Sequence, residues 1–126
     1  MSVPRWYLWE GGFVLTARAQ GVVPSHAHHA IQAERRIAVD ALVNCAGFGV
    51  PGTYAGSAWP LHAAMLRLHA STVAELTHAF LPDMIDRGYG RIINVASVAG
   101  LVRVGAGAMY GASKSFVVSL SRELHA

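Results

Sequence analysis

Two short apolar runs in this chain are separated by one long helical segment, and a second helical segment follows the second run. The runs occupy residues 41–43 and 92–96, and the helical segments extend from Pro60 to about residue 86 and from Ala108 onward. Short apolar runs bounded by loops are typical of buried strands. Strands that alternate with helices form parallel sheets through right-handed crossovers. The order of these segments therefore predicts an α/β fold, a parallel sheet with flanking helices.

Both helical segments have an apolar side. In the first, apolar residues recur at every third or fourth position, the repeat of an amphipathic helix. Pro60 suits the first turn of this helix, and Pro82 predicts a bend near its end. The residues expected on the apolar sides are Leu61, Met65, Leu68, Thr72, Leu76, Phe80 and Met84 in the first helix and Ala112, Phe116, Val117, Leu120 and Leu124 in the second.

The N-terminal part of the chain has a weaker pattern. Residues 1–12 have no clear period, residues 13–17 are rich in strand formers, and a helical stretch is predicted over about 28–37. Glycines and prolines predict loops at 47–59 and 100–107. Because no internal repeat divides the chain, we expect a single domain over residues 1–126, with 1–38 atypical and 39–126 regular.

Composition excludes several classes of protein. Apolar residues make up 53% of the 126 residues and charged residues 13%, so the chain is not of the disordered type. The net charge is +3, but only Arg35 and Arg36 are adjacent basic residues, so no nucleic-acid footprint is predicted. No apolar run is long enough to span a membrane, and the N-terminus lacks the pattern of a signal peptide. A single cysteine, Cys45, favours a reducing compartment, so we expect a cytoplasmic protein.

Tyr110 and Lys114 are four residues apart in the final helical segment. On a helix their side chains share one face, with Cβ atoms about 5–6 Å apart. Lys114 is the only lysine in the chain, and its ammonium would lower the pKa of the phenol toward a value suited to general acid–base catalysis. Ser97 follows the second apolar run, at the strand end where open parallel sheets bind ligands. The alternative interpretation is a helix-surface pair and a strand-end serine without a catalytic role.

The segment Gly47–Gly52 matches the pattern G-x-G-x-x-G after a strand. A dinucleotide fingerprint opens a helix directly and has an acidic residue about 20 positions further on. Here Pro51 and further loop residues precede Pro60, and the nearest acidic residue is Glu75. We therefore predict that this segment is a loop and not the phosphate-binding turn.

Three histidines, His26, His28 and His29, form a small cluster. A metal site needs convergent geometry and usually three or four ligands. We favour a solvated histidine-rich loop over a metal site and expect no bound metal.

The combination of motifs resembles the short-chain dehydrogenase/reductase family. Over roughly residues 39–126 the chain contains VDALVNCAGFG, then LTHAFLPDMIDRGYGRIINVASVAG, and then the Tyr-x-x-x-Lys motif of Tyr110 and Lys114. The resemblance implies a partial Rossmann-like, doubly wound parallel sheet. It also implies an NAD(P)-dependent oxidoreductase that interconverts a small-molecule carbonyl and an alcohol, and a homo-oligomer formed through the long helices.

The resemblance implies a role for each motif residue. Tyr110 would exchange a proton with the substrate oxygen, Ser97 would hydrogen-bond that oxygen, and Lys114 would hold the nicotinamide ribose. Residues that would line the cofactor side are Asn44, Ala46 and Gly47. Arg18 would meet the 2′-phosphate of NADP, which favours NADP over NAD.

The chain also departs from the family pattern. The glycine-rich phosphate-binding loop is absent, Cys45 replaces a common asparagine, and His69 stands where many members place a catalytic asparagine that holds a relay water. These departures favour the alternative of an incomplete, non-catalytic chain that serves, if at all, in oligomerisation or another interaction.

Overall fold

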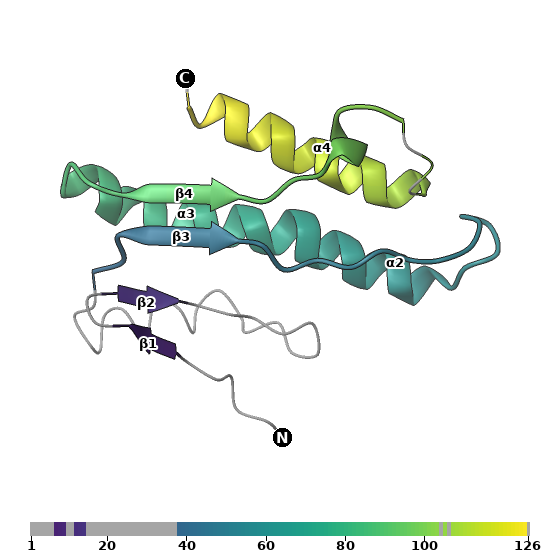
Figure 1. Ribbon diagram of the computed structural model, residues 1–126, viewed down its shortest axis with the longest axis horizontal. Coiled ribbons are helices and arrows are strands. Elements are labelled where there is room, and N and C mark those ends of the chain that lie inside the picture. Colours follow the sequence, from purple (N-terminus) through teal and green to yellow (C-terminus); the bar gives the residue numbers. More distant parts are fainter. Residues whose placement is uncertain (1–6, 10–11, 15–37, 104, 106, 126) are drawn as a thin grey trace.

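A computed structural model describes residues 7–9, 12–14, 38–103, 105 and 107–125. Two parallel strands and one long helical rod form the centre of the described part, with a second long helix beside the rod (Figure 1). This arrangement confirms the predicted α/β fold with flanking helices.

Strands β3 (Ala41–Asn44) and β4 (Arg91–Asn94) pair in parallel, in a register that places Ala41 beside Arg91 and Asn44 beside Asn94. Val95 N–H donates to Asn44 O at 2.9 Å and continues the ladder by one bond. Strand β4 thus begins one residue before the predicted run and ends at Asn94. The strand ends bring Asn44 and Asn94 side by side.

The crossover between the strands is a rod of three consecutive segments. These are α2 (Trp59–Leu66), the π-helical segment η1 (Arg67–Ser71) and α3 (Thr72–Asp86). Proline occupies the first turn of α2, as predicted. Helix α3 continues through Pro82, and the departure from α-helical geometry lies instead in η1.

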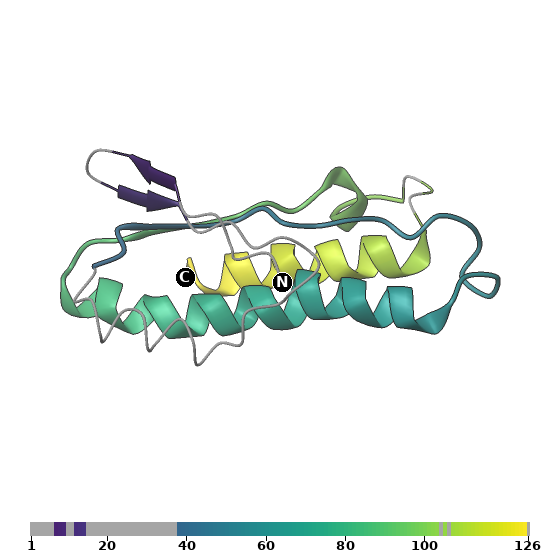
Figure 2. The same ribbon diagram turned by 90° about the horizontal axis from the view of Figure 1, so that it is seen from below.

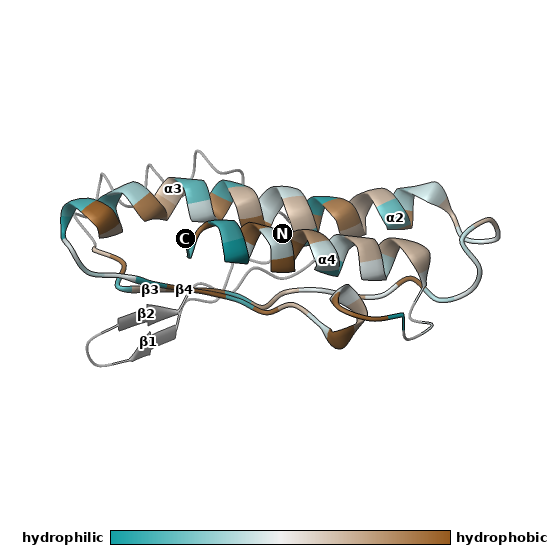
Figure 3. Ribbon diagram, turned by 90° about the horizontal axis from the view of Figure 1, so that it is seen from above, coloured by the Kyte–Doolittle hydropathy of each residue, from teal (hydrophilic) through white to brown (hydrophobic). Residues whose placement is uncertain are grey.

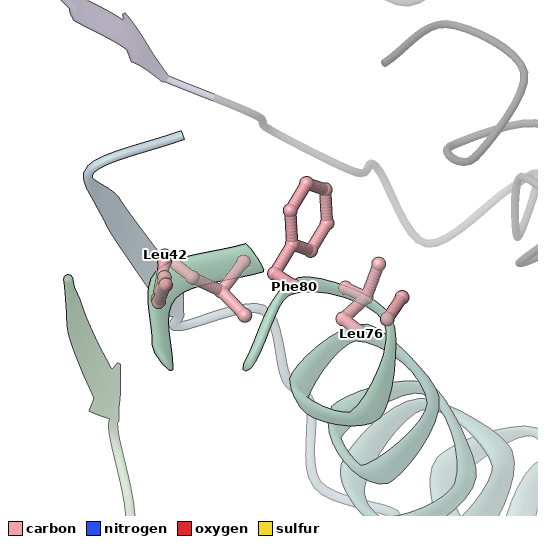
Figure 4. Packing of buried hydrophobic residues seen from close by; sticks show 5 residues of the cluster. Leu42, Leu76 and Phe80 are labelled. Carbon is pink, nitrogen blue, oxygen red and sulfur yellow. The ribbon is translucent and has the colours of Figure 1, made fainter. Parts of the chain in front are cut away.

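Helix α4 (Ala108–Glu123) lies beside the rod, and both are on the same side of the β3–β4 pair (Figure 2). The inner face of the strands packs on α3, where Leu42 meets Leu76 and Phe80 (Figure 4). Each such buried side chain contributes roughly 1.5–3 kcal/mol by leaving water. The cluster consists of Leu42, Leu76, Ala79, Phe80 and Met84, with Val39 and Ile92 packed against it.

The opposite face of the strands is open among the described residues. Val43, Ile93 and Val95 are 46%, 53% and 42% exposed. Alternate residues of a strand face opposite sides of a sheet, and the described helices cover one side. Apolar colouring also continues over the 3₁₀ turn η2 (Val98–Gly100) and the start of the segment after it (Figure 3).

The predicted apolar sides of the helices are only partly the buried ones. Met65, Leu68, Leu76, Phe80 and Met84 are buried as expected. Leu61, Ala112, Phe116 and Leu124 are exposed. Helix α4 packs through Val117, as expected, and also through Ser113 and Lys114, whose burial hydropathy alone did not predict.

A short antiparallel hairpin occupies the N-terminal part. It pairs β1 (Tyr7–Trp9) with β2 (Gly12–Val14). The sequence predicted a strand over 13–17, and Phe13 and Val14 lie in β2, whereas residues 1–12, which have no clear period, gave no signal for β1. Residues 15–17 and the helix predicted over 28–37 lie outside the described residues. The loop predicted at 100–107 follows η2, which ends at Gly100.

Candidate active site

Ser97 lies just beyond the carboxyl end of β4 and forms the N-cap of η2. Its Oγ accepts a hydrogen bond from Ala99 N–H at 3.2 Å. This bond satisfies one of the free amide groups at the start of the turn and fixes the hydroxyl at the strand end. Ser97 thus lies at the carboxyl end of the strand, where the sequence placed it.

Tyr110 and Lys114 lie on one face of α4, as their spacing predicted. Lys114 is only 6% exposed, and its Nζ donates to Val95 O at 3.0 Å. The same Nζ lies 6.0 Å from the centre of the Tyr110 ring. The ammonium is therefore fixed between the segment after β4 and the phenol.

Helix α4 and turn η2 pack with their backbones in close contact. A Cβ atom on Gly100 would lie 2.7 Å from the carbonyl carbon of Lys114, and one on Gly111 would lie 3.1 Å from Ala99 O. Ser115 Oγ donates to Gly100 O at 2.8 Å across the same contact. Glycine thus permits the approach that holds the turn of Ser97 against the helix of Lys114.

His69, which is only 1% exposed, lies between the turn after β3 and helix α4. Its Nε2 accepts a hydrogen bond from Phe48 N–H at 3.1 Å, and its Nδ1 lies 2.9 Å from Ser113 Oγ. The ring meets the Tyr110 ring edge-on, with the centroids 5.7 Å apart. The resemblance marked this position only as a departure, and the contacts make it a central part of the site.

Burial, and to a smaller extent the nearby charge of Lys114, together lower the pKa of His69 to about 4. A positive charge on the ring would be removed from water and would face another cation. The imidazole is therefore neutral at physiological pH.

The residues expected on the cofactor side occupy the end of β3 and the turn after it. Asn44 Nδ2 donates to Asn94 Oδ1 at 2.8 Å, and Asn94 Nδ2 donates to Ser121 Oγ at 3.0 Å. Ala46 is exposed. A Cβ atom on Gly47 would lie 2.7 Å from His69 Nε2, so this glycine is required by the histidine beside it.

Two side chains of that chain of hydrogen bonds were missed by the sequence analysis. From the sequence, Asn94 was interpreted as one residue of an apolar strand and Ser121 as a polar residue of a helix. Only the parallel register, which sets Asn44 against Asn94, brings the amides together.

The segment Gly47–Gly52 opens no helix, as predicted, because α2 begins only at Trp59. Arg18 and the cluster of His26, His28 and His29 lie outside the described residues. Within the described part of the chain, no group of three or more His, Cys, Asp or Glu side chains is placed to hold a metal ion. Among these residues there is also no helix with the length and apolar character needed to cross a membrane.

A second buried histidine lies near Tyr110. His62 is 5% exposed, its Nε2 is 2.7 Å from Ser57 Oγ, and its ring stacks at a tilt on Tyr54. A small cavity of about 10 Å³ is lined by residues that include His62, Met109 and Tyr110. The period of α2 gave no signal for this arrangement, because a histidine on a helix reads as polar surface.

A family model described as short chain dehydrogenase matches residues 23–126. The chain belongs to the short-chain dehydrogenase family. It is 36% identical over 80 residues to the ketoacyl reductase HetN of Nostoc sp., a match that covers 64% of this chain and 28% of that protein. It is 34% identical over 93 residues to the NADP-dependent 3-hydroxy acid dehydrogenase YdfG of Escherichia coli, covering 68% of this chain and 35% of that protein.

Solved structures share the fold. A gluconate 5-dehydrogenase from Burkholderia cenocepacia, in complex with NADP and tartrate, superposes with a TM-score of 0.71 at 30% identity and covers 79% of this chain and 39% of that chain. The fold is therefore Rossmann-like, as the family resemblance implied. The chain spans between 28% and 39% of the length of these proteins.

Proposed function

We propose that this chain forms part of an NAD(P)-dependent oxidoreductase that interconverts a carbonyl and an alcohol by hydride transfer. One observation carries the proposal: a phenol and a buried ammonium share one face of α4, with the ammonium 6.0 Å from the ring of Tyr110. The names of the relatives, a ketoacyl reductase and an NADP-dependent dehydrogenase, support it.

Three side chains act on the substrate and cofactor in this proposal. Tyr110 donates a proton to the substrate oxygen in the reductive direction and accepts it in the oxidative direction. Ser97 hydrogen-bonds the same oxygen and orients it. Lys114 holds the cofactor ribose through ammonium protons that its bond to Val95 O leaves available. When bound, the nicotinamide supplies or accepts the hydride.

The described residues fit the nicotinamide end of such a cofactor better than its phosphate end. The carboxyl ends of two parallel strands meet there, with Asn44 at the end of β3 and Ser97 just beyond β4. Among the described residues, Gly105 and Gly107 lead directly into α4, but no G-x-G-x-x-G segment opens a helix. The chain's own residues would therefore orient the reacting ring, while the pyrophosphate needs donors from elsewhere.

NADP is the favoured cofactor within this proposal. YdfG is named as NADP-dependent, and the gluconate 5-dehydrogenase structure contains NADP. Arg18 stays the predicted partner of the 2′-phosphate. We further propose a homo-oligomer through the long helices, supported by exposed apolar residues on α4 such as Phe116, and a cytoplasmic location, supported by the single cysteine.

A second candidate function is a non-catalytic interaction module. The observation that favours it is the lack of a phosphate-binding turn among the described residues. Titration with NADPH and NADH, followed by fluorescence or calorimetry, separates the two candidates. Saturable micromolar binding supports the oxidoreductase, and no binding at millimolar cofactor supports the module.

The decisive test is a pair of tyrosine variants of the 126-residue chain. Tyr110→Phe removes the exchangeable proton and should lower kcat by about 10²–10⁴-fold with a panel of ketones and NADPH. Tyr89→Phe removes a phenol that is 55% exposed at the far end of α3 and should leave kcat unchanged. Equal activity of the Tyr110 variant and the wild type would overturn the catalytic assignment.

A further inference from the structure

His69 connects three segments that are distant in sequence. It belongs to η1, it contacts Phe48 in the turn after β3, and it contacts Ser113 on α4. The extra residue per turn of a π-helical segment rotates the side chains that follow. This segment lies where the rod passes α4, and it directs the buried ring of His69 between the turn after β3 and α4.

The hydrogen bonds permit only one tautomer of the imidazole. Ser113 has a single hydroxyl proton, which it donates to Tyr110 O at 2.8 Å. Ser113 Oγ must therefore accept from His69, and the imidazole proton lies on Nδ1. Nε2 then carries no proton, which agrees with its role as acceptor from Phe48 N–H.

Both ring nitrogens are consequently occupied. Nδ1–H donates a hydrogen bond to Ser113 Oγ, and the lone pair of Nε2 accepts one from the Phe48 amide. The ring in this state has no nitrogen left to hold a relay water or to transfer a proton. A proton relay of the kind that the family resemblance implies at this position therefore does not run through the ring nitrogens of His69.

We propose that His69 is a positioning residue that couples the cofactor-side turn after β3 to the helix of Tyr110. One nitrogen holds the backbone at Phe48, and the other holds Ser113, which in turn binds the carbonyl of Tyr110. The ring also packs against both aromatic neighbours, 6.1 Å from Phe48 and 5.7 Å from Tyr110. The contacts do not depend on the proposed function, whereas their effect on turnover rests on it.

The close approach of Gly47 supports this coupling. A Cβ at that position would come within 2.7 Å of Nε2, so the turn is pressed onto the imidazole with no room for a side chain. A shift of the ring would move the turn, and a shift of the turn would move the ring. The same contact gives a steric reason for a glycine at Gly47.

Two substitutions separate the two bonds. In His69→Asn the side-chain amide nitrogen can stand near the place of Nδ1 and keep the bond to Ser113, while the bond to Phe48 is lost. In His69→Gln the amide oxygen can reach the place of Nε2 and keep the bond to Phe48, while the bond to Ser113 is lost. His78→Gln, at an exposed position of α3, is the matched control.

Steady-state kinetics of the full chain should show opposite effects. We expect His69→Asn to raise the KM for NADPH about tenfold with a smaller change in kcat, and His69→Gln to lower kcat about tenfold with a smaller change in KM. The control should change neither. Equal effects of the two variants on both constants would overturn the coupling.

Nitrogen NMR of the wild-type chain tests the link without any need for activity. We expect the Nδ1–H tautomer for His69 and slow hydrogen exchange at the Phe48 amide. If the chain is inactive but these signals are present, the link stands and the proposed function fails. An Nε2–H tautomer or a rapidly exchanging Phe48 amide would overturn the link itself, and this result holds even if the variants fail to fold.

Discussion

Lys114 Nζ and Val95 O form a 3.0 Å hydrogen bond that joins α4 to the segment after β4. The lysine is almost fully buried, and among the described residues no carboxylate pairs with it, since the two ion pairs found there both belong to Arg87. Burying an ammonium without a counterion is costly. Such a group is typical of functional sites, where a ligand uses the charge.

Removing this charge should change a neighbour as well as the ligand site. In Lys114→Met we expect the pKa of His69 to rise from about 4, because one of the two causes of its lowering is gone. The rise should be partial, since burial is the larger cause and stays. Proton NMR titration of the His69 ring measures the change.

The control for this prediction is Arg122→Met, which removes an exposed cation from the same helix. It should leave the His69 titration where it is in the wild type. A shift of the same size in both variants would show that the effect is not local to Lys114.

The lowered pKa of His69 predicts a specific dependence of stability on pH. The unfolded ring binds its proton near pH 6.5 and the folded ring only near 4. Stability is therefore complete above pH 6.5 and falls as the pH decreases toward 4, by about 3 kcal/mol in total. Urea denaturation at a series of pH values measures this slope.

His69→Gln provides the reference for the same experiment, because glutamine has no proton to gain in this range. The difference in unfolding free energy between wild type and variant should depend on pH between 6.5 and 4 and become constant above it. A difference that does not vary with pH would contradict the buried neutral state of the ring.

The contact between η2 and α4 predicts a steric effect. In Gly100→Ala the new methyl group would lie 2.7 Å from the backbone of Lys114, so the turn or the helix must move. We expect a loss of about 1–3 kcal/mol in unfolding free energy. In Gly49→Ala the nearest atom, on the ring of Tyr110, would be 4.0 Å away, and stability should stay within about 1 kcal/mol. Equal thermal melting temperatures of the two variants would show that the contact has room to yield.

The chain of polar groups at the strand ends predicts a coupling. Asn94→Ala removes both the acceptor for Asn44 and the donor to Ser121, and should cost about 1–3 kcal/mol of unfolding free energy. Ser121→Ala in the Asn94→Ala background should then add less than it does alone, because its partner is already gone. Strict additivity in urea denaturation would contradict the bond.

Much of the fold could be predicted from the order of segments. The two strands, the long crossover and the final helix follow from apolar runs and periodicity, which depend on local sequence. The hairpin of β1 and β2 could not be predicted this way, because Tyr7–Trp9 has no period and pairs only with its neighbour across a turn.

The candidate site, too, could be predicted where it depends on local sequence and not where it depends on distant segments. The pairing of Tyr110 with Lys114 follows from helical spacing, and the place of Ser97 follows from the end of a strand. The link through His69 could not be predicted, because it depends on a π-helical turn and on three segments meeting. The burial of Ser113 and Lys114 on α4 was missed for a related reason: their partners bury these two side chains, and their hydropathy does not.

The contact of Gly100 with Lys114 has a mechanical consequence. At Gly100, turn η2 and helix α4 touch through main-chain atoms, and the short side chain of Ser115 adds a hydrogen bond across the same contact. When α4 moves, η2 should move with it as one rigid body, and Ser97, the N-cap of η2, should move as well. The serine hydroxyl and the phenol of Tyr110 would then keep a constant spacing while ligands enter and leave, so that the surrounding chain, and not the reacting groups, accommodates the movement.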